Sequence, residues 1–88
     1  MTQINMDLIA NVTNLIEVLN GIEEKILNFP FHSLSLMFVN SSGTHIIRYS
    51  DSFEESKSAV IHQLNKILRY PQNYDDVIVY VNTKLCKY

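Results

Sequence analysis

Three histidines and one cysteine are the side chains of this sequence that best suit a bound metal ion: His32, His45, His62 and Cys86. Zinc sites use these residue types at short, regular spacings, because ligands from one turn converge on one ion. Here the four residues fall on an expected loop, strand, helix and tail, and they lack such spacing. We therefore expect no metal ion and no other cofactor.

A serine or cysteine nucleophile activated by histidine is a second kind of chemistry to consider. The chain has only two glycines, which excludes a glycine-framed nucleophile, a phosphate-binding loop and a dinucleotide-binding loop. The carboxylate pairs Glu54-Glu55 and Asp75-Asp76 are adjacent in sequence, so their side chains diverge instead of sharing a proton. We expect no enzyme and no small-molecule substrate; a small enzyme with an unrecognised site is the second alternative.

A candidate basic patch is formed by His62, Lys66 and Arg69, which follow one another at helical spacing. Clustered cations attract phosphate backbones. The net charge of -2 and the isoelectric point of about 5.8 argue against such an attraction for the chain as a whole. Basic residues near the end of a helix also complement its dipole. A nucleic-acid-binding transcriptional regulator, with Arg48, Lys84 and Lys87 beside this patch, is therefore the first alternative.

Length and composition indicate one folded domain spanning residues 1-88. Independent domains run from roughly 50 to 250 residues, and the chain is 47% hydrophobic and 18% charged. A single cysteine excludes an internal disulfide and suits a reducing compartment. The first residues lack the basic stretch and apolar run of a secretory signal, and no segment has the roughly 20 apolar residues of a membrane span. We expect a cytoplasmic protein that does not contact membranes.

The first 27 residues predict an amphipathic helix from Ile4 to Leu27. Apolar residues recur there at spacings of four and three, at Leu8, Val12, Leu15, Leu19, Ile22 and Ile26. Asn20-Gly21 is a common helix stop, so the segment divides there if that pair ends the helix. Phe29-Pro30-Phe31 ends the helical region, because proline disfavours helical geometry before it.

The rest of the chain predicts a hairpin, a second helix and a third strand. Residues 33-39 and 44-50 alternate in polarity around a turn in which Gly43 can adopt a positive φ. A helix over 52-70 begins at a capping box of Ser52 and Glu55 and stops at Tyr70-Pro71. Residues 71-75 read as a loop, and 77-83 form the strongest strand.

Connection rules turn this order into an α+β fold with a three-stranded antiparallel sheet ordered 2-1-3. One face carries Leu34, Leu36 and Phe38 with Val77, Val79 and Val81, and packs on the second helix. The other face carries a mixed surface that is too apolar for plain exposure. Its members are Ser35, Met37, Val39, Ile78, Tyr80 and Asn82, joined either by Ile46 and Arg48 or by His45, Ile47 and Tyr49.

Two interpretations of that second face stay open at this point. The first helix can fold over it and complete an α/β/α core. Alternatively another protein or a second copy of the chain covers it, or an edge strand pairs across an interface. Tyr49, Tyr74, Tyr80 and Tyr88 would suit an aromatic interaction surface.

By elimination, the sequence favours a non-enzymatic protein-binding module. The candidate interface consists of Met37, Val39, Ile46, Arg48, Ile78 and Tyr80. Frequent Ile, Asn, Tyr and Lys with scarce Ala, Gly and Arg are the residue usage of an AT-rich genome. That usage adds the hypothesis of a small phage- or plasmid-encoded inhibitor of a host protein, of the anti-defence type.

Overall fold

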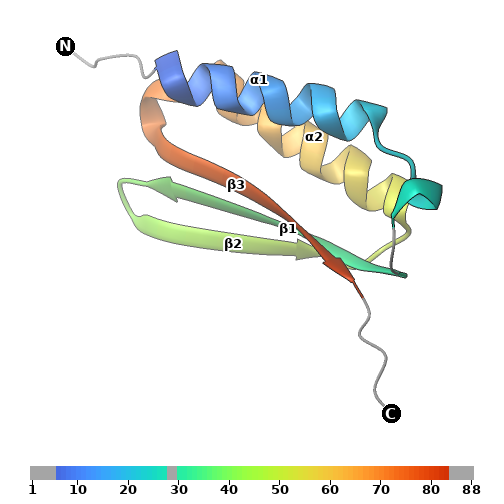
Figure 1. Cartoon of the computed structure of the whole chain (residues 1–88). Helices are drawn as coiled ribbons and strands as arrows, with labels where there is room; N and C mark the ends of the chain where they lie inside the picture. The colour runs from blue at the N-terminus through green and yellow to red at the C-terminus, as the bar shows by residue number, and fades with distance from the viewer. Residues whose placement is uncertain (1–5, 28–29, 84–88) are drawn as a thin grey trace.

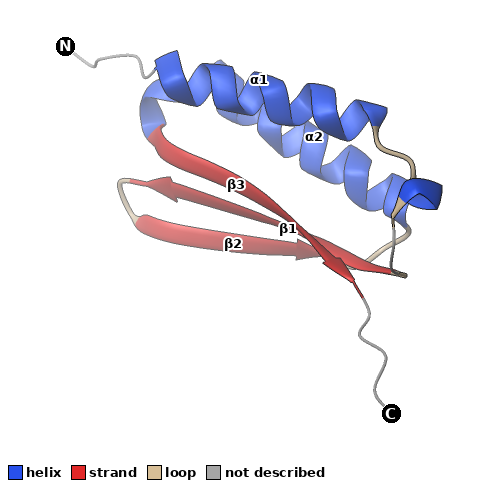
Figure 2. Cartoon of the chain, viewed as in Figure 1, coloured by secondary structure: helices blue, strands red, loops and turns tan. Residues whose placement is uncertain are grey.

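The order of helix, hairpin, helix and strand predicted from the sequence is the order of the structure. The computed structural model describes residues 6–27 and 30–83, and Figures 1 and 2 show the arrangement of its elements. The α-helices and strands are α1 (Met6–Gly21), β1 (Phe31–Asn40), β2 (Gly43–Tyr49), α2 (Phe53–Arg69) and β3 (Tyr74–Thr83). Two short 3-10 turns, η1 (Glu24–Ile26) and η2 (Pro71–Asn73), precede β1 and β3.

The three strands form one antiparallel sheet in the predicted order β2-β1-β3. In its register Leu36 of β1 lies opposite Ile47 of β2 and Val79 of β3. The β1–β2 turn closes with Gly43 at a φ of 119°, a value that a residue with a side chain rarely adopts. The predicted role of Gly43 is thereby confirmed.

Both helices pack on the same face of the sheet, so the interpretation that α1 covers the opposite face is wrong (Figure 1). The buried core joins Leu8, Val12 and Leu19 of α1 with residues from α2, β1 and β3, namely Leu34, Leu36, Val60, Leu64, Ile67 and Val77. This face holds Leu34, Leu36, Val77 and Val79, although the expected core residue Val81 is 42% exposed. The other face mixes Met37, Val39, Ile46 and Ile78 with serines, an asparagine and an arginine. The apolar stripe of α1 packs on this face, against α2 and β3.

Two polar contacts hold α1 in this place. Asn11 donates its side-chain amide to the carbonyl of Val77 in β3, at 3.0 Å. Lys57 of α2 donates from Nζ to the carbonyl of Ile22, at 3.1 Å. The last turn of α1 has no basic residue, so this lysine supplies from another element the cation that a helix C-terminus favours.

The predicted division of the first helical region at Asn20-Gly21 is confirmed, because α1 ends at Gly21. A continuous helix to Leu27 is wrong, and so is the placement of Ile26 on its buried stripe: that side chain is 62% exposed on η1. The new turn rotates Ile26 away from the direction that helical spacing gives it. The expected start at Ile4 lies outside the described residues.

The second helix begins and ends as predicted. The Ser52 hydroxyl accepts the backbone N–H of Glu55 at 3.2 Å, which is the first half of the expected capping box, and the helix stops before Tyr70-Pro71. The expected loop over 71–75 is partly wrong, since β3 already starts at Tyr74. Pairing of Tyr74 with Asn40 and of Asp76 with Val39 overrides the low strand propensity of the acidic pair. The first strand also starts earlier than the expected Ser33, at Phe31.

No helix in the described segments combines the length and hydropathy that crossing a lipid bilayer requires.

Candidate functional site

The six candidate interface residues lie together on the sheet face that turns away from the helices. They come from all three strands: Met37 and Val39 from β1, Ile46 and Arg48 from β2, and Ile78 and Tyr80 from β3. The register places Met37 between Ile46 and Ile78, and Ser35 between Arg48 and Tyr80. We call this surface, completed by Ser33, Ser35 and Asn82, the open face.

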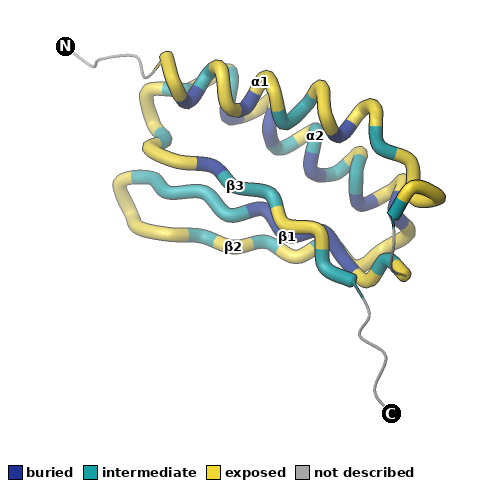
Figure 3. The backbone as a smooth tube through the Cα atoms, in the orientation of Figure 1, coloured by how far each residue is buried: buried dark blue, intermediate teal, exposed yellow. Residues whose placement is uncertain are grey.

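No helix or strand in residues 6–27 and 30–83 covers the open face. Ile46 is 66% exposed and Tyr80 is 46% exposed, while Met37, Val39 and Ile78 are half-buried between their neighbours. Figure 3 shows the buried positions gathered between the helices and the sheet. An apolar row of two isoleucines and a methionine thus runs across the sheet in contact with solvent, which is typical of a binding surface when it is rimmed by polar groups.

One end of the open face is polar and internally satisfied. The side-chain amide of Asn82 donates to the hydroxyls of Ser33, at 3.1 Å, and Ser35, at 2.9 Å. Both serines are buried, although they lie on the face without helices. This network links β1 to β3 and ends the apolar row.

The open face also carries charge at its two edges. Arg48 lies on the β2 edge, and Asp76, opposite Val39, lies on the β3 edge. The Asp76 carboxylate accepts the N–H of Val77 at 2.9 Å. A surface of this kind has an apolar centre and a polar rim, as protein–protein interfaces commonly do.

The sequence left open which residues of β2 belong to this face, and the hairpin register decides it. Ile46 and Arg48 lie on the open face, whereas His45, Ile47 and Tyr49 lie opposite Phe38, Leu36 and Leu34 on the helix side. The length of the hairpin loop would have predicted this assignment, because a two-residue loop fixes the register of the two strands. A shift of one residue would move every side chain of β2 to the opposite face.

The expected aromatic surface of four tyrosines does not form among those described. Tyr80 is on the open face, but Tyr49 is on the helix side, where burial raises the pKa of its hydroxyl. Tyr74 meets Phe38 edge to face at 5.6 Å between ring centroids. Tyr49 lies opposite Leu34 and Tyr80 opposite Ser35. Because these consecutive residues of β1 point to opposite faces, the two tyrosines do as well. Tyr88 lies outside the described residues.

The candidate basic patch is present on α2, where His62, Lys66 and Arg69 are all exposed. Arg48 does not join it, because the sheet separates the open face from the helices. Lys84 and Lys87, the other expected neighbours, lie outside the described residues. The described part of the patch therefore holds two permanent cations and one histidine.

His45 lies on β2 and His62 on α2, but His32 lies within β1 and not on the expected loop. No group of histidine, cysteine and carboxylate residues in the described segments is placed to bind a metal ion. His32 lines a hollow with Glu24 and Asp51 near the start of β1, at the opposite end of the sheet from His45. Cys86 lies outside the described residues.

One serine and one histidine do meet, in the β1–β2 turn. Ser42 Oγ lies 2.9 Å from Nε2 of His45, and both contact the side-chain oxygen of Asn40, at 2.7 and 3.2 Å. The same oxygen accepts the N–H of Ser42 at 2.9 Å. Asparagine commonly stabilises a turn through this contact, so the cluster is explained by the hairpin and requires no catalytic role.

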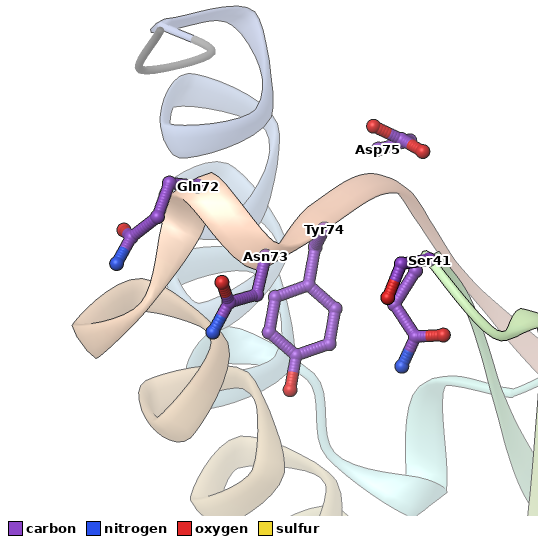
Figure 4. Close-up of a pocket in the computed structure, with 6 residues that line it drawn as sticks. Ser41, Gln72, Asn73, Tyr74 and Asp75 are labelled. Atoms are coloured by element: carbon purple, nitrogen blue, oxygen red, sulfur yellow. The ribbon is translucent and has the colours of Figure 1, made fainter. Parts of the chain in front are cut away.

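A polar hollow of about 530 Å³ lies beside this turn, lined by Asn40, Ser41, Gln72, Asn73, Tyr74 and Asp75. In Figure 4 the Tyr74 ring lies between Asn73 and Ser41, and Asp75 points away from its hydroxyl. A general base must reach the proton that it abstracts. Asp75 supplies the only carboxylate among the lining residues.

Comparison of the chain with protein-family models, with curated proteins and with solved structures finds no match.

Proposed function

We propose that this protein is a non-enzymatic module that binds another protein through its open face. The observation that supports the proposal is the solvent-exposed apolar row of Ile46, Met37 and Ile78, beside the half-exposed Tyr80. Burial of apolar surface drives most protein association. Tyrosine and arginine, which the open face also contains, are enriched among the residues that dominate binding energy.

The polar surroundings of this row favour a protein partner over a nucleic acid. Arg48 is balanced by Asp76 on the opposite edge, and neither gives the open face the dense positive charge that phosphate backbones require. On the other side of the molecule, the basic patch of His62, Lys66 and Arg69 shares its helix with Glu54 and Glu55. Contact through shape and apolar burial therefore suits the molecule better than attraction to phosphates.

The test compares two exposed tyrosines of the same protein. Tyr80 is 46% exposed on the open face, and Tyr70 is 56% exposed at the end of α2. Tagged wild-type protein, Tyr80→Asp and Tyr70→Asp capture proteins from extracts of the source organism, followed by quantitative mass spectrometry. We expect at least one protein to bind wild type and Tyr70→Asp and to lose most of its binding to Tyr80→Asp.

A second measurement maps the contact directly. A photoreactive phenylalanine analogue in place of Tyr80 should cross-link the captured protein, whereas the same analogue in place of Tyr70 should not. Unchanged helix content by circular dichroism shows that each variant is folded. Equal cross-linking from both positions, or equal loss in both aspartate variants, would overturn the proposal.

The nucleic-acid alternative is tested with the double variant Lys66→Glu, Arg69→Glu. If the basic patch acts on DNA or RNA, wild type should bind a mixed-sequence duplex with an affinity that falls steeply with salt, and this variant should not bind. Under the proposed function wild type shows no such binding, and the double variant keeps the protein partner.

A further inference from the structure

The two edges of the sheet are protected to different degrees. An edge strand presents unpaired N–H and C=O groups, and most proteins block it with charges, bulges or a covering element. At the β3 edge, Asn11 occupies the carbonyl of Val77, Asp75 and Asp76 add charge, and the register with β1 shifts next to Asp76. Between Gly43 and Tyr49, β2 has no proline, lysine or acidic residue, and its one permanent charge is Arg48 near one end. Its register with β1 is regular.

The alternation of hydrogen bonds identifies which backbone groups of β2 point outward. The carbonyl of Val77 bonds to Asn11, so it points away from β1, and Val77 and Phe38 form a pair without mutual hydrogen bonds. Phe38 therefore directs its backbone groups toward His45 on β2. Because the direction alternates along a strand, the outward N–H and C=O groups belong to Thr44, Ile46 and Arg48.

These three residues suit pairing with an identical strand. When two copies of β2 run antiparallel with Ile46 opposite Ile46, Thr44 of each copy lies opposite Arg48 of the other, and all seven residues of the strand are paired. Each outward residue then meets another outward residue. A slide that places Arg48 opposite Arg48 would bring like charges together, which destabilises a strand pair, and every slide shortens the pairing.

The positions of the helices leave this edge accessible. α1 contacts β3 and α2, and α2 packs against α1 and β1 and touches β2 less. Both helices lie over one face of the sheet, so the outer edge of β2 stays uncovered (Figure 1). Symmetric pairing of β2 with β2 also closes the assembly at two copies, whereas pairing of β2 with β3 would continue into fibres. The side chain of Ile46, which is 66% exposed in the monomer, would contact its symmetry mate across the two-fold axis.

From the less protected β2 edge and its symmetric register we infer that the protein forms a homodimer through antiparallel pairing of β2 with β2. The dimer has one six-stranded sheet with all four α-helices on one side. The two-fold axis runs perpendicular to the sheet, so the two open faces join into a single surface with the two Ile46 side chains at its centre. The dimer stands independently of the proposed function; only the use of the joined surface by a protein partner rests on it.

Site-directed cross-linking tests the register, in a Cys86→Ser background that removes the natural cysteine. Opposed residues of a hydrogen-bonded pair have Cα atoms about 5.5 Å apart, within the range that a disulfide spans. Under oxidation, Ile46→Cys should form a covalent dimer. An equimolar mixture of Thr44→Cys and Arg48→Cys chains should also cross-link.

The matched control is Arg48→Cys alone. Its two copies would lie four residues apart along the paired strands, roughly 13 Å, which is too far for a disulfide. Cross-linking of Arg48→Cys as efficient as that of Ile46→Cys, or no cross-linking of Ile46→Cys, overturns the inference.

Light scattering over a range of concentrations tests the dimer itself. Wild type should have about twice the chain mass of 10.2 kDa, and Ile46→Lys should raise the dimer dissociation constant by about tenfold or more, because two cations then meet at the axis. Ile26→Lys is the matched control, since Ile26 is 62% exposed on η1, and Tyr80→Lys tests the open face away from β2. Both should remain dimeric.

The other outcomes of this measurement contradict the inference in different ways. A wild-type protein that is monomeric at every concentration excludes the dimer but leaves the open face available to another protein. A dimer that Tyr80→Lys disrupts and Ile46→Lys does not would show that the sheets stack face to face instead. The capture experiment separates the two proposals, because loss of the partner in Tyr80→Asp with an intact dimer affects only the proposed function.

Discussion

The two faces of the sheet are made from the same three strands, yet they contribute to different properties of the molecule. On the helix side, Leu34 and Leu36 are fully buried by α1 and α2. On the open face, the intervening Met37 is only half-buried, and its row ends in the exposed Ile46. The first face supplies stability and the second supplies a surface, because a two-layer fold has helices for only one side of its sheet.

The difference also shows how a short chain uses its apolar residues. The apolar stripe of α1, formed by Leu8, Val12 and Leu19, is buried beside α2 and β3, so α1 is not available to cover the open face. The uncovered face then keeps a polar network at one end, from Asn82 to Ser33 and Ser35, and an apolar row in the middle. This division is expected of a chain whose second face has a use outside the monomer.

The largest effect should come from shortening a side chain on the helix side of the sheet, compared with its neighbour on the open face. Leu36→Ala removes a fully buried side chain and should lower the free energy of unfolding by about 2–5 kcal/mol. Met37→Ala, one residue along the same strand, should cost less than about 1.5 kcal/mol because its side chain is partly solvated already. Urea unfolding monitored by circular dichroism measures both, below the concentration at which the chain associates. Equal costs would mean that the open face is part of the monomer core.

An intermediate effect is expected at the polar end of the open face. Asn82→Ala leaves the buried hydroxyls of Ser33 and Ser35 without their donor and should cost about 1–3 kcal/mol of stability. Asn65→Ala, at an exposed position of α2, is the control and should change stability by less than about 0.5 kcal/mol. If both variants unfold at the same urea concentration as wild type, the network does not stabilise the fold.

The smallest effect concerns Tyr49, on the helix side of β2. Burial raises the pKa of its hydroxyl, so above pH of about 10 the unfolded chain ionises this tyrosine while the folded chain still holds the proton. Its contribution to stability is therefore complete below that pH and is lost as the pH rises through the higher pKa of the folded state.

Tyr49→Phe should therefore weaken the decline of stability with alkaline pH. The measurement is the urea midpoint at pH of about 8 and about 10.5, bracketing the ordinary tyrosine pKa. Tyr70→Phe, on the exposed end of α2, provides the comparison. A decline in Tyr49→Phe as steep as that in wild type would show that another group causes the loss.

Several features of the molecule are properties of the sequence alone. Alternating polarity over 33–39 and 44–50, helical spacing over 52–70 and the β-branched run over 77–83 were sufficient for the α+β class, the element order and the sheet order 2-1-3. Local geometry explains this success, because strand alternation and helical periodicity are set by neighbouring residues. Ser52 as a cap, Gly43 in the turn and the stop at Gly21 belong to the same local level.

Other features depended on long-range packing. The register of the hairpin decided that Ile46 and Arg48, and not Ile47 and Tyr49, lie on the open face. The extension of β3 back to Tyr74 came from pairing with β1, against the propensity of its acidic residues.

No local sequence pattern predicted which face of the sheet α1 packs on. The apolar periodicity of a helix shows that one side is buried but does not identify the surface that buries it. The sequence therefore did not decide which face of the sheet α1 covers. The tertiary structure placed α1 beside α2, where Asn11 reaches the carbonyl of Val77 and Lys57 reaches that of Ile22. That packing left the open face and the β2 edge uncovered, because the free energy of the whole core, and not of any one element, selects the side.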